Sequence, residues 1–212
     1  GDIINATYTT SAPKIAMNSV RYFFRDSTLF FAFKAFLFFF VVGIVTLAWT
    51  KILAGILIAI ALLLAVIIWR YLSLRKVEFK NAVLTPGVVI AQKPPTVLIL
   101  ANLVCDGRKT PVLGLKVKEC RSLEPLSAEI GTRIPCVTAF LGSGLEGCWD
   151  TMVCNPLTSG TGNRKLLEQA LARLDDEDDW RVLNDAVQKK MIPALGKTLR
   201  LPPSSPQSAF RR

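Results

Sequence analysis

The sequence predicts a transmembrane helical hairpin followed by an α+β domain. Residues 29–49 contain a single charge, Lys34, and residues 52–69 contain none. A run of about 18 apolar residues is long enough to cross a bilayer as a helix. From residue 77 onward, short apolar runs alternate with Pro and Gly, and two helical patterns follow them. This order favours a small antiparallel sheet or partly open five-strand barrel packed by two amphipathic helices.

The same patterns divide the chain into four parts. They are a cytoplasmic or interfacial segment at 1–28, the transmembrane hairpin at 29–71, a cytoplasmic α+β domain at 77–200 and a disordered tail at 201–212. Residues 13–26 interleave apolar and basic side chains, which is typical of a short helix lying in the membrane interface. The alternative is a leader that continues the first span. A signal peptide is not expected, because the apolar core is too long and no small-residue cleavage pattern follows it.

The two apolar runs must be antiparallel, because only Thr50 and Lys51 join them. Basic residues mark the cytoplasmic ends of spans, and here they flank the outer ends of the hairpin, so both termini of a multi-pass protein should face the cytoplasm. They are Lys14, Arg21 and Arg25 before the hairpin and Arg70, Arg75, Lys76 and Lys80 after it. Lys34 lies about one turn inside the first span, where its stem can snorkel to the headgroups. The alternative is an intramembrane charge for a substrate path or a partner's carboxylate.

Side chains within the spans indicate how the helices pack. Gly55 and Ala59 form a small-xxx-small pair, which lets helices approach closely in lipid. We expect this pair to pack on the chain's own first span. Phenylalanines surround the first span between residues 30 and 40, and they indicate lipid exposure together with packing against a large neighbour.

The distribution of charge points to the bilayer as a partner. The net charge is +10, and residues 1–76 hold eight Lys/Arg against two Asp/Glu. Such an excess beside the spans matches anionic lipid headgroups, and no nucleic acid is expected. A nucleic-acid-binding barrel would need aromatic side chains along its strands for base stacking. The predicted strands offer essentially Phe140 and Trp149.

The chain has no histidine and five cysteines. Without histidine there is no Ser-His or Cys-His nucleophile, no imidazole base and no His-ligated metal. A catalytic Ser-Lys pair or carboxylate pair remains an alternative in principle, although no spacing in the sequence indicates one. Cys148 and Cys154 could pair or bind a metal, but an odd count on the cytoplasmic side indicates reduced thiols, and nothing completes a zinc site. We therefore predict a protein that is not an enzyme, with no catalytic residue, cofactor or metal.

The α+β domain is predicted to contain five strands and two helices. The strands are 82–91, 96–103, 111–120, 133–141 and 147–153, and the helices are 164–174 and 178–191. Residues 142–147 match G-x-G-x-x-G, but a strand-like run follows them, so we expect a hairpin loop and not a dinucleotide site. The acidic run 175–179 lacks the spacing of a calcium loop and is expected to favour the start of the second helix.

A glycine-rich loop before the first of these helices is the candidate ligand site. It consists of Ser159, Gly160, Thr161, Gly162 and Asn163, with Arg164 at the helix start. Backbone amides at a helix N-terminus can bind a phosphate. The alternative, which we favour, is a turn in which Asn163 caps the helix, because Asn is among the best N-cap residues.

Two segments, together with the hairpin before them, carry a family resemblance. Residues 80–89 (KNAVLTPGVV) and 130–136 (IGTRIPC) resemble a bacterial family of uncharacterised membrane proteins with an N-terminal anchor and a compact C-terminal domain. The resemblance implies the bacterial inner membrane and transfers no site or reaction, since these motifs are expected to be turn residues. The leading hypothesis is a non-enzymatic, membrane-anchored interaction module, a subunit or accessory protein of a larger inner-membrane complex. The alternative is a membrane-tethered sensor or enzyme that binds a phosphorylated ligand at 159–165.

Overall fold

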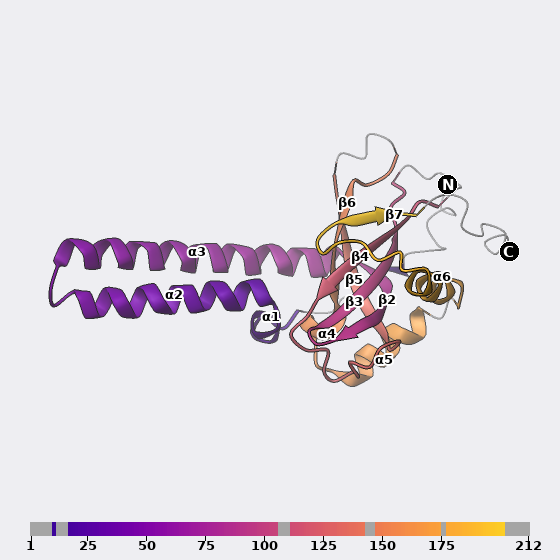
Figure 1. Cartoon of the computed structure of the whole chain (residues 1–212), viewed down its shortest axis with the longest axis horizontal. Coiled ribbons are helices and arrows are strands. Elements are labelled where there is room, and N and C mark those ends of the chain that lie inside the picture. Colours follow the sequence, from indigo (N-terminus) through magenta and orange to yellow (C-terminus); the bar gives the residue numbers. More distant parts are fainter. Residues whose placement is uncertain (1–9, 12–16, 106–110, 143–146, 175–176, 202–212) are drawn as a thin grey trace.

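A computed structural model shows a long helical hairpin that projects from an α+β domain (Figure 1). The structure describes residues 10–11, 17–105, 111–142, 147–174 and 177–201. The hairpin consists of α2 (Ser27–Thr46) and α3 (Lys51–Asn81), and the short helix α1 (Ser19–Arg25) lies at its base. The predicted fold class, a helical hairpin followed by an α+β domain, is confirmed.

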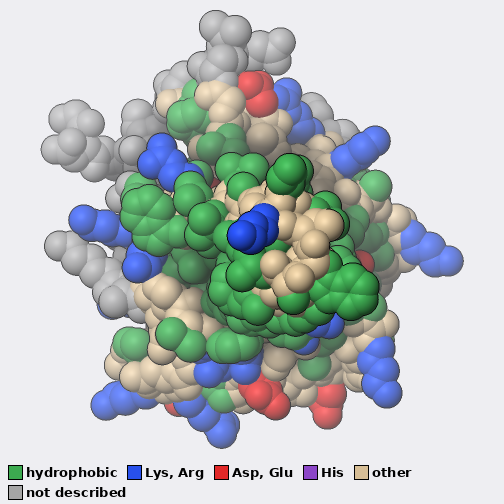
Figure 2. Space-filling view, turned by 90° about the vertical axis from the view of Figure 1, so that its left-hand side faces the viewer, with side chains coloured by type: hydrophobic (Ala, Val, Ile, Leu, Met, Phe, Trp, Pro, Cys, Tyr) green, Lys and Arg blue, Asp and Glu red, His purple; other side chains and the backbone are tan. Residues whose placement is uncertain are grey.

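Both hairpin helices are long and apolar enough to cross a membrane. At about 1.5 Å per residue α2 spans about 30 Å, which is the thickness of a hydrocarbon core. Only 11% of the most apolar stretch of α2 and 17% of that of α3 are buried, so neither is the core helix of a soluble domain. Seen from its tip, the hairpin presents mainly hydrophobic side chains, and Lys and Arg side chains lie around it on the domain (Figure 2). This surface suits contact with the hydrocarbon chains of a bilayer.

Small residues inside the hairpin let α2 and α3 approach each other. A Cβ on Gly43 would lie 3.0 Å from a side chain of α3, and Ala54 and Ala61 are fully buried. By contrast, a Cβ on Gly55 would meet nothing within 4 Å, and both Gly55 and Ala59 are exposed. The expectation that this pair packs on the first span is therefore wrong. Because a helix turns by about 100° per residue, Ala54 and Ala61 face α2 while the pair points outward.

Asp26 separates α1 from α2. Its Oδ1 accepts hydrogen bonds from the amides of Thr28 and Leu29, at 2.9 and 3.0 Å, and so caps α2. The N-terminal segment is therefore not a leader that continues the first span. Instead, α1 docks on the domain through Tyr22, which is 1% exposed. Phe24 on the same helix stays exposed, and its placement in the membrane interface remains a prediction.

Lys34 follows the direction that snorkelling requires. Its Nζ lies 4.8 Å from the centroid of the Phe30 ring, one turn nearer to the start of α2. The long stem thus carries the ammonium toward the domain side of the hairpin and away from its middle.

The sheet is antiparallel, and seven of its strands lie in the described part of the chain. They are β1 (Thr10–Ser11), β2 (Val83–Gln92), β3 (Pro95–Asn102), β4 (Leu113–Glu119), β5 (Arg133–Leu141), β6 (Thr151–Pro156) and β7 (Thr198–Arg200). Six follow the order β6-β5-β2-β3-β4-β7, and β1 pairs with the start of β2. The two strands that were not predicted, β1 and β7, have only two and three residues, too few for a sequence pattern.

The predicted strands agree with the structure except for the last. The first four predictions lie within two residues of β2, β3, β4 and β5. The fifth, predicted at 147–153, is wrong in its bounds, because Pro156 ends β6 and does not form a turn with Asn155. Pro86 and Gly87 lie within β2, as the predicted strand 82–91 places them, opposite Pro135 and Ile134 of β5.

Both faces of the sheet are buried, because the sheet curls into an open half-barrel and β4 meets β6. On β3, Leu98 and Leu100 face one core while Val97 and Ile99 face the other, and all four are at most 1% exposed. The first core packs against α1, α5, α6 and the end of α3. The second core lies inside the curl and includes Leu103, Ile134, Cys136, Met152 and Cys154.

Three helices follow β6. They are α4 (Leu157–Gly160), α5 (Arg164–Arg173) and α6 (Glu177–Gln188). The two predicted amphipathic helices are confirmed as α5 and α6, and α6 begins with acidic residues as expected, although residues 175–176 lie outside the described residues. The short helix α4 is an addition, and it makes the first part of the predicted 159–163 loop helical.

Two further predictions fall partly on residues that are not described. The segment between β5 and β6 is a hairpin connection as expected, with Gly142 and Gly147 at positive φ, while residues 143–146 lie outside the described part. Of the predicted tail, Leu201 is buried and its amide donates to the carbonyl of Leu113 at 2.8 Å, which contradicts disorder at that residue. Residues 202–212 lie outside the described residues.

Candidate functional site at the foot of the hairpin

The foot of the hairpin, the start of α2 together with residues 70–81 of α3, is fixed to the domain. α3 continues past the start of α2 and inserts Phe79, which is 3% exposed, into the first core. Phe79 contacts Tyr22 of α1 edge to face, with ring centroids 5.5 Å apart. This contact joins α1 and α3 to each other and to the first core, so the domain has a defined orientation on the hairpin.

Two arginines of α1 strengthen this docking. Arg21 Nε donates to the carbonyl of Thr158 at 3.1 Å, and its Nη2 donates to the carbonyl of Glu124 at 2.6 Å. Arg25 Nη1 donates to the same Glu124 carbonyl at 2.7 Å. These contacts join α1 to the loop before β5 and to α4, which lie far from it in the sequence.

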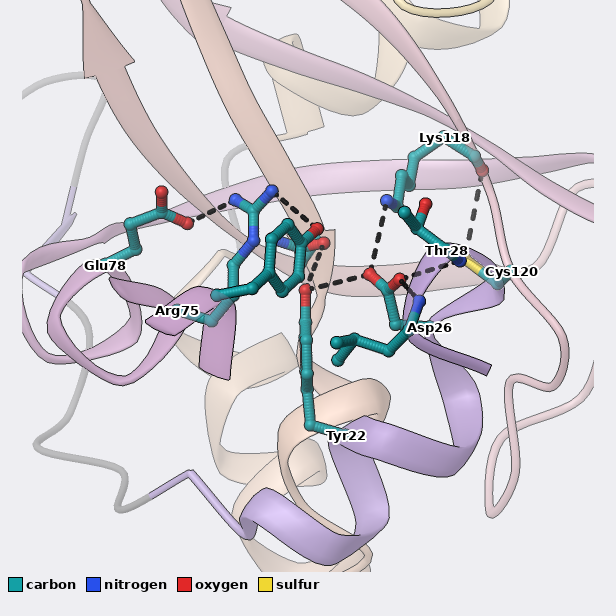
Figure 3. Close-up of polar contacts among 10 residues, drawn as sticks. Tyr22, Asp26, Thr28, Arg75, Glu78, Lys118 and Cys120 are labelled. Carbon is teal, nitrogen blue, oxygen red and sulfur yellow. Dashed lines mark hydrogen bonds and ion pairs between the residues drawn. The ribbon is translucent and has the colours of Figure 1, made fainter. Parts of the chain in front are cut away.

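A buried polar cluster of Tyr22, Asp26 and Asn155 lies where α1 docks on the domain (Figure 3). The Tyr22 hydroxyl donates to Asp26 Oδ2 at 3.2 Å and lies 3.4 Å from Asn155 Oδ1 of β6. Burial, and next to it the charge of Asp26, raise the pKa of Tyr22 above its ordinary value, so the phenol stays neutral. Lys118 Nζ of β4 lies 4.0 Å from Asp26 Oδ2. Asp26 therefore connects α1, α2 and the sheet through one carboxylate.

Arg75 of α3 approaches the same cluster from the other side (Figure 3). Its Nη2 donates to the hydroxyl of Tyr71 at 2.8 Å, and its guanidinium lies over that ring, 4.6 Å from the centroid. Its Nη1 forms an ion pair with Glu78. These contacts hold the guanidinium plane in one orientation at the foot of the hairpin.

A pocket of about 320 Å³ opens between the foot of the hairpin and the sheet. Ser27 and Thr28 of α2, Arg75 of α3 and the segment before β7 form part of its wall, and β4 and β6 form the rest. Lys116 and Lys118 of β4 both line it, since residues two apart on a strand face the same side. We call this cavity, with its cations Arg75, Lys116 and Lys118, the junction pocket.

The three cations of the junction pocket differ in how they are compensated. Arg75 pairs with Glu78, and Lys118 lies near Asp26. Lys116 donates to the carbonyl of Met152, and no carboxylate of the described residues lies within ion-pair distance of it. Burial lowers the pKa of Lys116, the neighbouring Cys154 raises it, and the charges of Lys118 and Arg75 lower it. When Lys116 is protonated, no carboxylate of the described residues is paired with its ammonium.

The predicted ligand loop lies elsewhere, under α1. Ser159 and Gly160 belong to α4 and are buried, as is Thr161, while Gly162, Asn163 and Arg164 are exposed. The carbonyl of Gly160 accepts from the amide of Asn18, and a Cβ on Gly162 would collide with the Arg21 guanidinium. Arg164 Nε donates to Glu168 of its own helix at 2.9 Å. The loop thus contributes mainly to the docking of α1, and its role in binding a phosphorylated ligand stays a prediction.

The predicted cap of α5 is confirmed, because Asn163 Oδ1 accepts from the amide of Leu166 at 3.4 Å. We expect Asn163→Ala to lower the free energy of unfolding by about 1 kcal/mol, a typical loss for an N-cap. Asn163→Asp keeps an acceptor at the same place and should cost less. Urea unfolding of the full chain in mild detergent measures both variants. An equal loss in the two would show that the side-chain acceptor is not what matters.

The structure describes all five cysteines, and none of them is in a disulfide. Cys136 and Cys154 lie in the second core, and burial raises the pKa of both thiols, that of Cys154 to about 11. Burial also raises the pKa of Cys120 to about 12. Groups of three or more metal-ligating side chains do not occur among the described residues. These thiols act as small apolar side chains within the sheet.

The junction pocket was not predicted from the sequence. Arg75 follows the second span, where a basic residue is already explained by membrane topology. Lys116 and Lys118 alternate with apolar residues on one strand, which is the ordinary pattern of a strand with one exposed face. Their same-face spacing is the one local signal, and it does not show that the foot of the hairpin lies against that face.

An apolar hairpin fixed rigidly to a curled sheet defines a membrane-anchored α+β protein. The chain belongs to the family described as a protein of unknown function, DUF3239, whose match covers residues 72–190. The predicted membership of a family of uncharacterised proteins is thereby confirmed. The chain is also similar to a crystal structure of a "putative membrane protein" from Corynebacterium diphtheriae, at 19% identity and a TM-score of 0.47, over 56% of this chain and 99% of that one. A comparison with curated proteins finds no match.

Proposed function

We propose that the protein is a non-enzymatic interaction module of the bacterial inner membrane, a subunit or accessory protein of a larger membrane complex. The observation that carries this proposal is the outward face of the hairpin. Its own packing uses Gly43, Ala54 and Ala61, and it leaves a second small pair, Gly55 and Ala59, exposed. Association of helices in lipid depends on close packing, so such a pair favours contact with a helix of another protein.

The other side chains of the hairpin support the same interpretation. Phe31 and Phe38 of α2 are 75% and 63% exposed. Exposed rings on α2 and the exposed small pair on α3 give the hairpin an apolar surface that suits packing against a neighbouring helix. The rigid foot of the hairpin then sets the orientation in which the α+β domain meets the part of a partner that lies outside the bilayer.

Substitution at the small pair tests the proposal. In mild detergent, the full chain should migrate in a native gel at a mass well above its own, together with a stoichiometric partner. Gly55→Leu should disrupt this assembly and leave the chain alone. Ile67→Phe is the matched control: it adds bulk at an exposed position about 120° around the helix from Gly55. A chain that is alone without any substitution, or an equal effect of both substitutions, would contradict the proposal.

We propose that both termini face the cytoplasm and the tip of the hairpin faces the outside, because basic residues cluster at the foot of the hairpin while only Lys51 lies at its tip. In a Cys105→Ser background, a membrane-impermeant maleimide added to intact cells should label Thr50→Cys at the tip. It should label Gln169→Cys, an exposed position on α5, only after lysis. Labelling of Gln169→Cys in intact cells would place the domain outside the cytoplasm and overturn the proposed orientation.

A further inference from the structure

The junction pocket lies at the depth of the lipid headgroups if the hairpin spans the bilayer as proposed. α2 has 20 residues, and 20 residues counted from the start of α3 at Lys51 reach Arg70, so the start of α2 at Ser27 lies close to the level of Arg70. Arg75 is five residues further along α3, about 7.5 Å at the rise of an α-helix. The headgroup layer is roughly 5–8 Å deep on each side of the hydrocarbon core. Ser27, Thr28 and Arg75, which line the pocket, therefore fall within that layer.

The polar groups of the pocket suit an anion with several oxygens. Arg75 offers a planar guanidinium that is already fixed by Tyr71 and Glu78, and Lys116 and Lys118 offer two ammonium groups from one side of β4. Glu119 is the one carboxylate among the residues that line the pocket. Arginine and lysine together are the usual partners of phosphate, which accepts several charge-assisted hydrogen bonds.

The charge balance adds a specific point of attraction within the pocket. Lys116 is half-buried, has no carboxylate partner among the described residues and faces two further cations. An anion placed beside it would compensate that charge and relieve the repulsion among the three side chains. A pocket that is complete without a ligand would be expected to supply a carboxylate at this point.

Size favours a headgroup and not a whole lipid. The pocket, about 320 Å³, lies at the lower end of the roughly 300–1,000 Å³ range of ligand sites. Val153 and Leu195 give part of its wall an apolar character, which suits the glycerol carbons beside a phosphate.

We propose that the junction pocket binds a phosphate group, which the headgroup of an anionic lipid supplies where the foot of the hairpin enters the bilayer. Arg75, Lys116 and Lys118 contact the phosphate oxygens, and the acyl chains of the lipid extend along α2 and α3. The bound lipid fixes the depth of the domain at the membrane surface. This inference rests on the proposed membrane anchoring and is independent of any protein partner.

Thermal unfolding of the full chain in mild detergent tests the inference. Short-chain phosphatidylglycerol should raise the melting temperature, whereas the zwitterionic phosphatidylcholine should not, because a ligand that binds only the native state stabilises it. Lys116→Gln keeps a donor for the Met152 carbonyl and removes the charge, and it should weaken the apparent affinity for phosphatidylglycerol about tenfold. Lys118→Gln serves as a second variant should Lys116→Gln fail to fold.

Two control variants separate the pocket from diffuse attraction. Arg70→Gln removes an exposed charge that lies outside the pocket at the level of Ser27, and Arg164→Ala removes the arginine of the 159–164 loop. Neither should change the response to phosphatidylglycerol. Equal losses in Lys116→Gln and Arg70→Gln, or a loss confined to Arg164→Ala, would overturn the assignment to the pocket.

A soluble arm of the experiment identifies the source of the phosphate. Inorganic phosphate and glycerol phosphate should give a much smaller stabilisation than the lipid at equal concentration. If glycerol phosphate gives a Lys116-dependent shift in melting temperature as large as that with phosphatidylglycerol, the ligand is a soluble phosphate ester and the lipid assignment is overturned. If no phosphate compound shifts the melting temperature while Thr50→Cys is still labelled from outside, the pocket inference fails and the membrane anchoring stands.

Discussion

Replacing Tyr22 with alanine is expected to lower the free energy of unfolding by about 3–5 kcal/mol, the usual cost of removing a large buried ring. Tyr22 is 1% exposed, and its ring contacts Phe79 at the point where α1, α3 and the first core meet. The substitution removes that contact and the hydroxyl that donates to Asp26. We expect α1 to leave the domain and the domain to lose its fixed orientation on the hairpin.

Two further variants show which part of Tyr22 matters. Tyr22→Phe keeps the ring and loses only the hydroxyl, so it should cost about 1–3 kcal/mol, the penalty for leaving buried polar groups without a partner. Phe24→Ala removes an exposed ring of the same helix and should have little effect. Urea unfolding followed by tryptophan fluorescence measures all three, because Trp180 is buried in the first core. Equal, small losses for Tyr22→Ala and Phe24→Ala would mean that α1 is not docked as described.

Elements that depend on one segment of the chain could be predicted from the sequence. The two spans needed only length and composition, and α5 and α6 needed only an apolar period and suitable first-turn residues. The Asn163 cap and the acidic start of α6 are also local, because a cap involves residues within one turn of each other. Four strands were likewise visible as apolar runs between turn residues.

The junction pocket depends on contacts between distant segments, and no local pattern encodes it. Arg75, Lys116 and Lys118 come together only because the half-barrel brings β4 to the foot of the hairpin. Tyr22 and Phe79 show the same limit, since each lies in a segment that could equally have faced lipid. The prediction that Gly55 and Ala59 pack on the first span was wrong for a related reason. A small-residue pair shows that a close contact is possible, but not which helix makes it.

Gly87 shows how a residue typical of turns can be required within a strand. It lies in the middle of β2, between β3 and β5, and is buried. A Cβ at this position would lie 2.7 Å from Cys136 Sγ and 2.9 Å from a methyl group of Val97. No positive φ is involved, so the requirement comes from the second core, which leaves room for a hydrogen atom alone.

Gly87→Ala is therefore expected to cost about 1–3 kcal/mol through overpacking, and Gly87→Val more. Because the Cys136 sulfur is the nearest obstacle, Cys136→Ala should relieve part of that cost, and the double variant should be more stable than the sum of the single losses predicts. Gly131→Ala is the control: its site has open space and positive φ, so its backbone strain should be unaffected by Cys136→Ala. Urea unfolding of the parent, Gly87→Ala, Cys136→Ala and the double variant gives the coupling energy directly. Strict additivity of Gly87→Ala and Cys136→Ala would show that the glycine is required by the strand backbone and not by the packing of the second core.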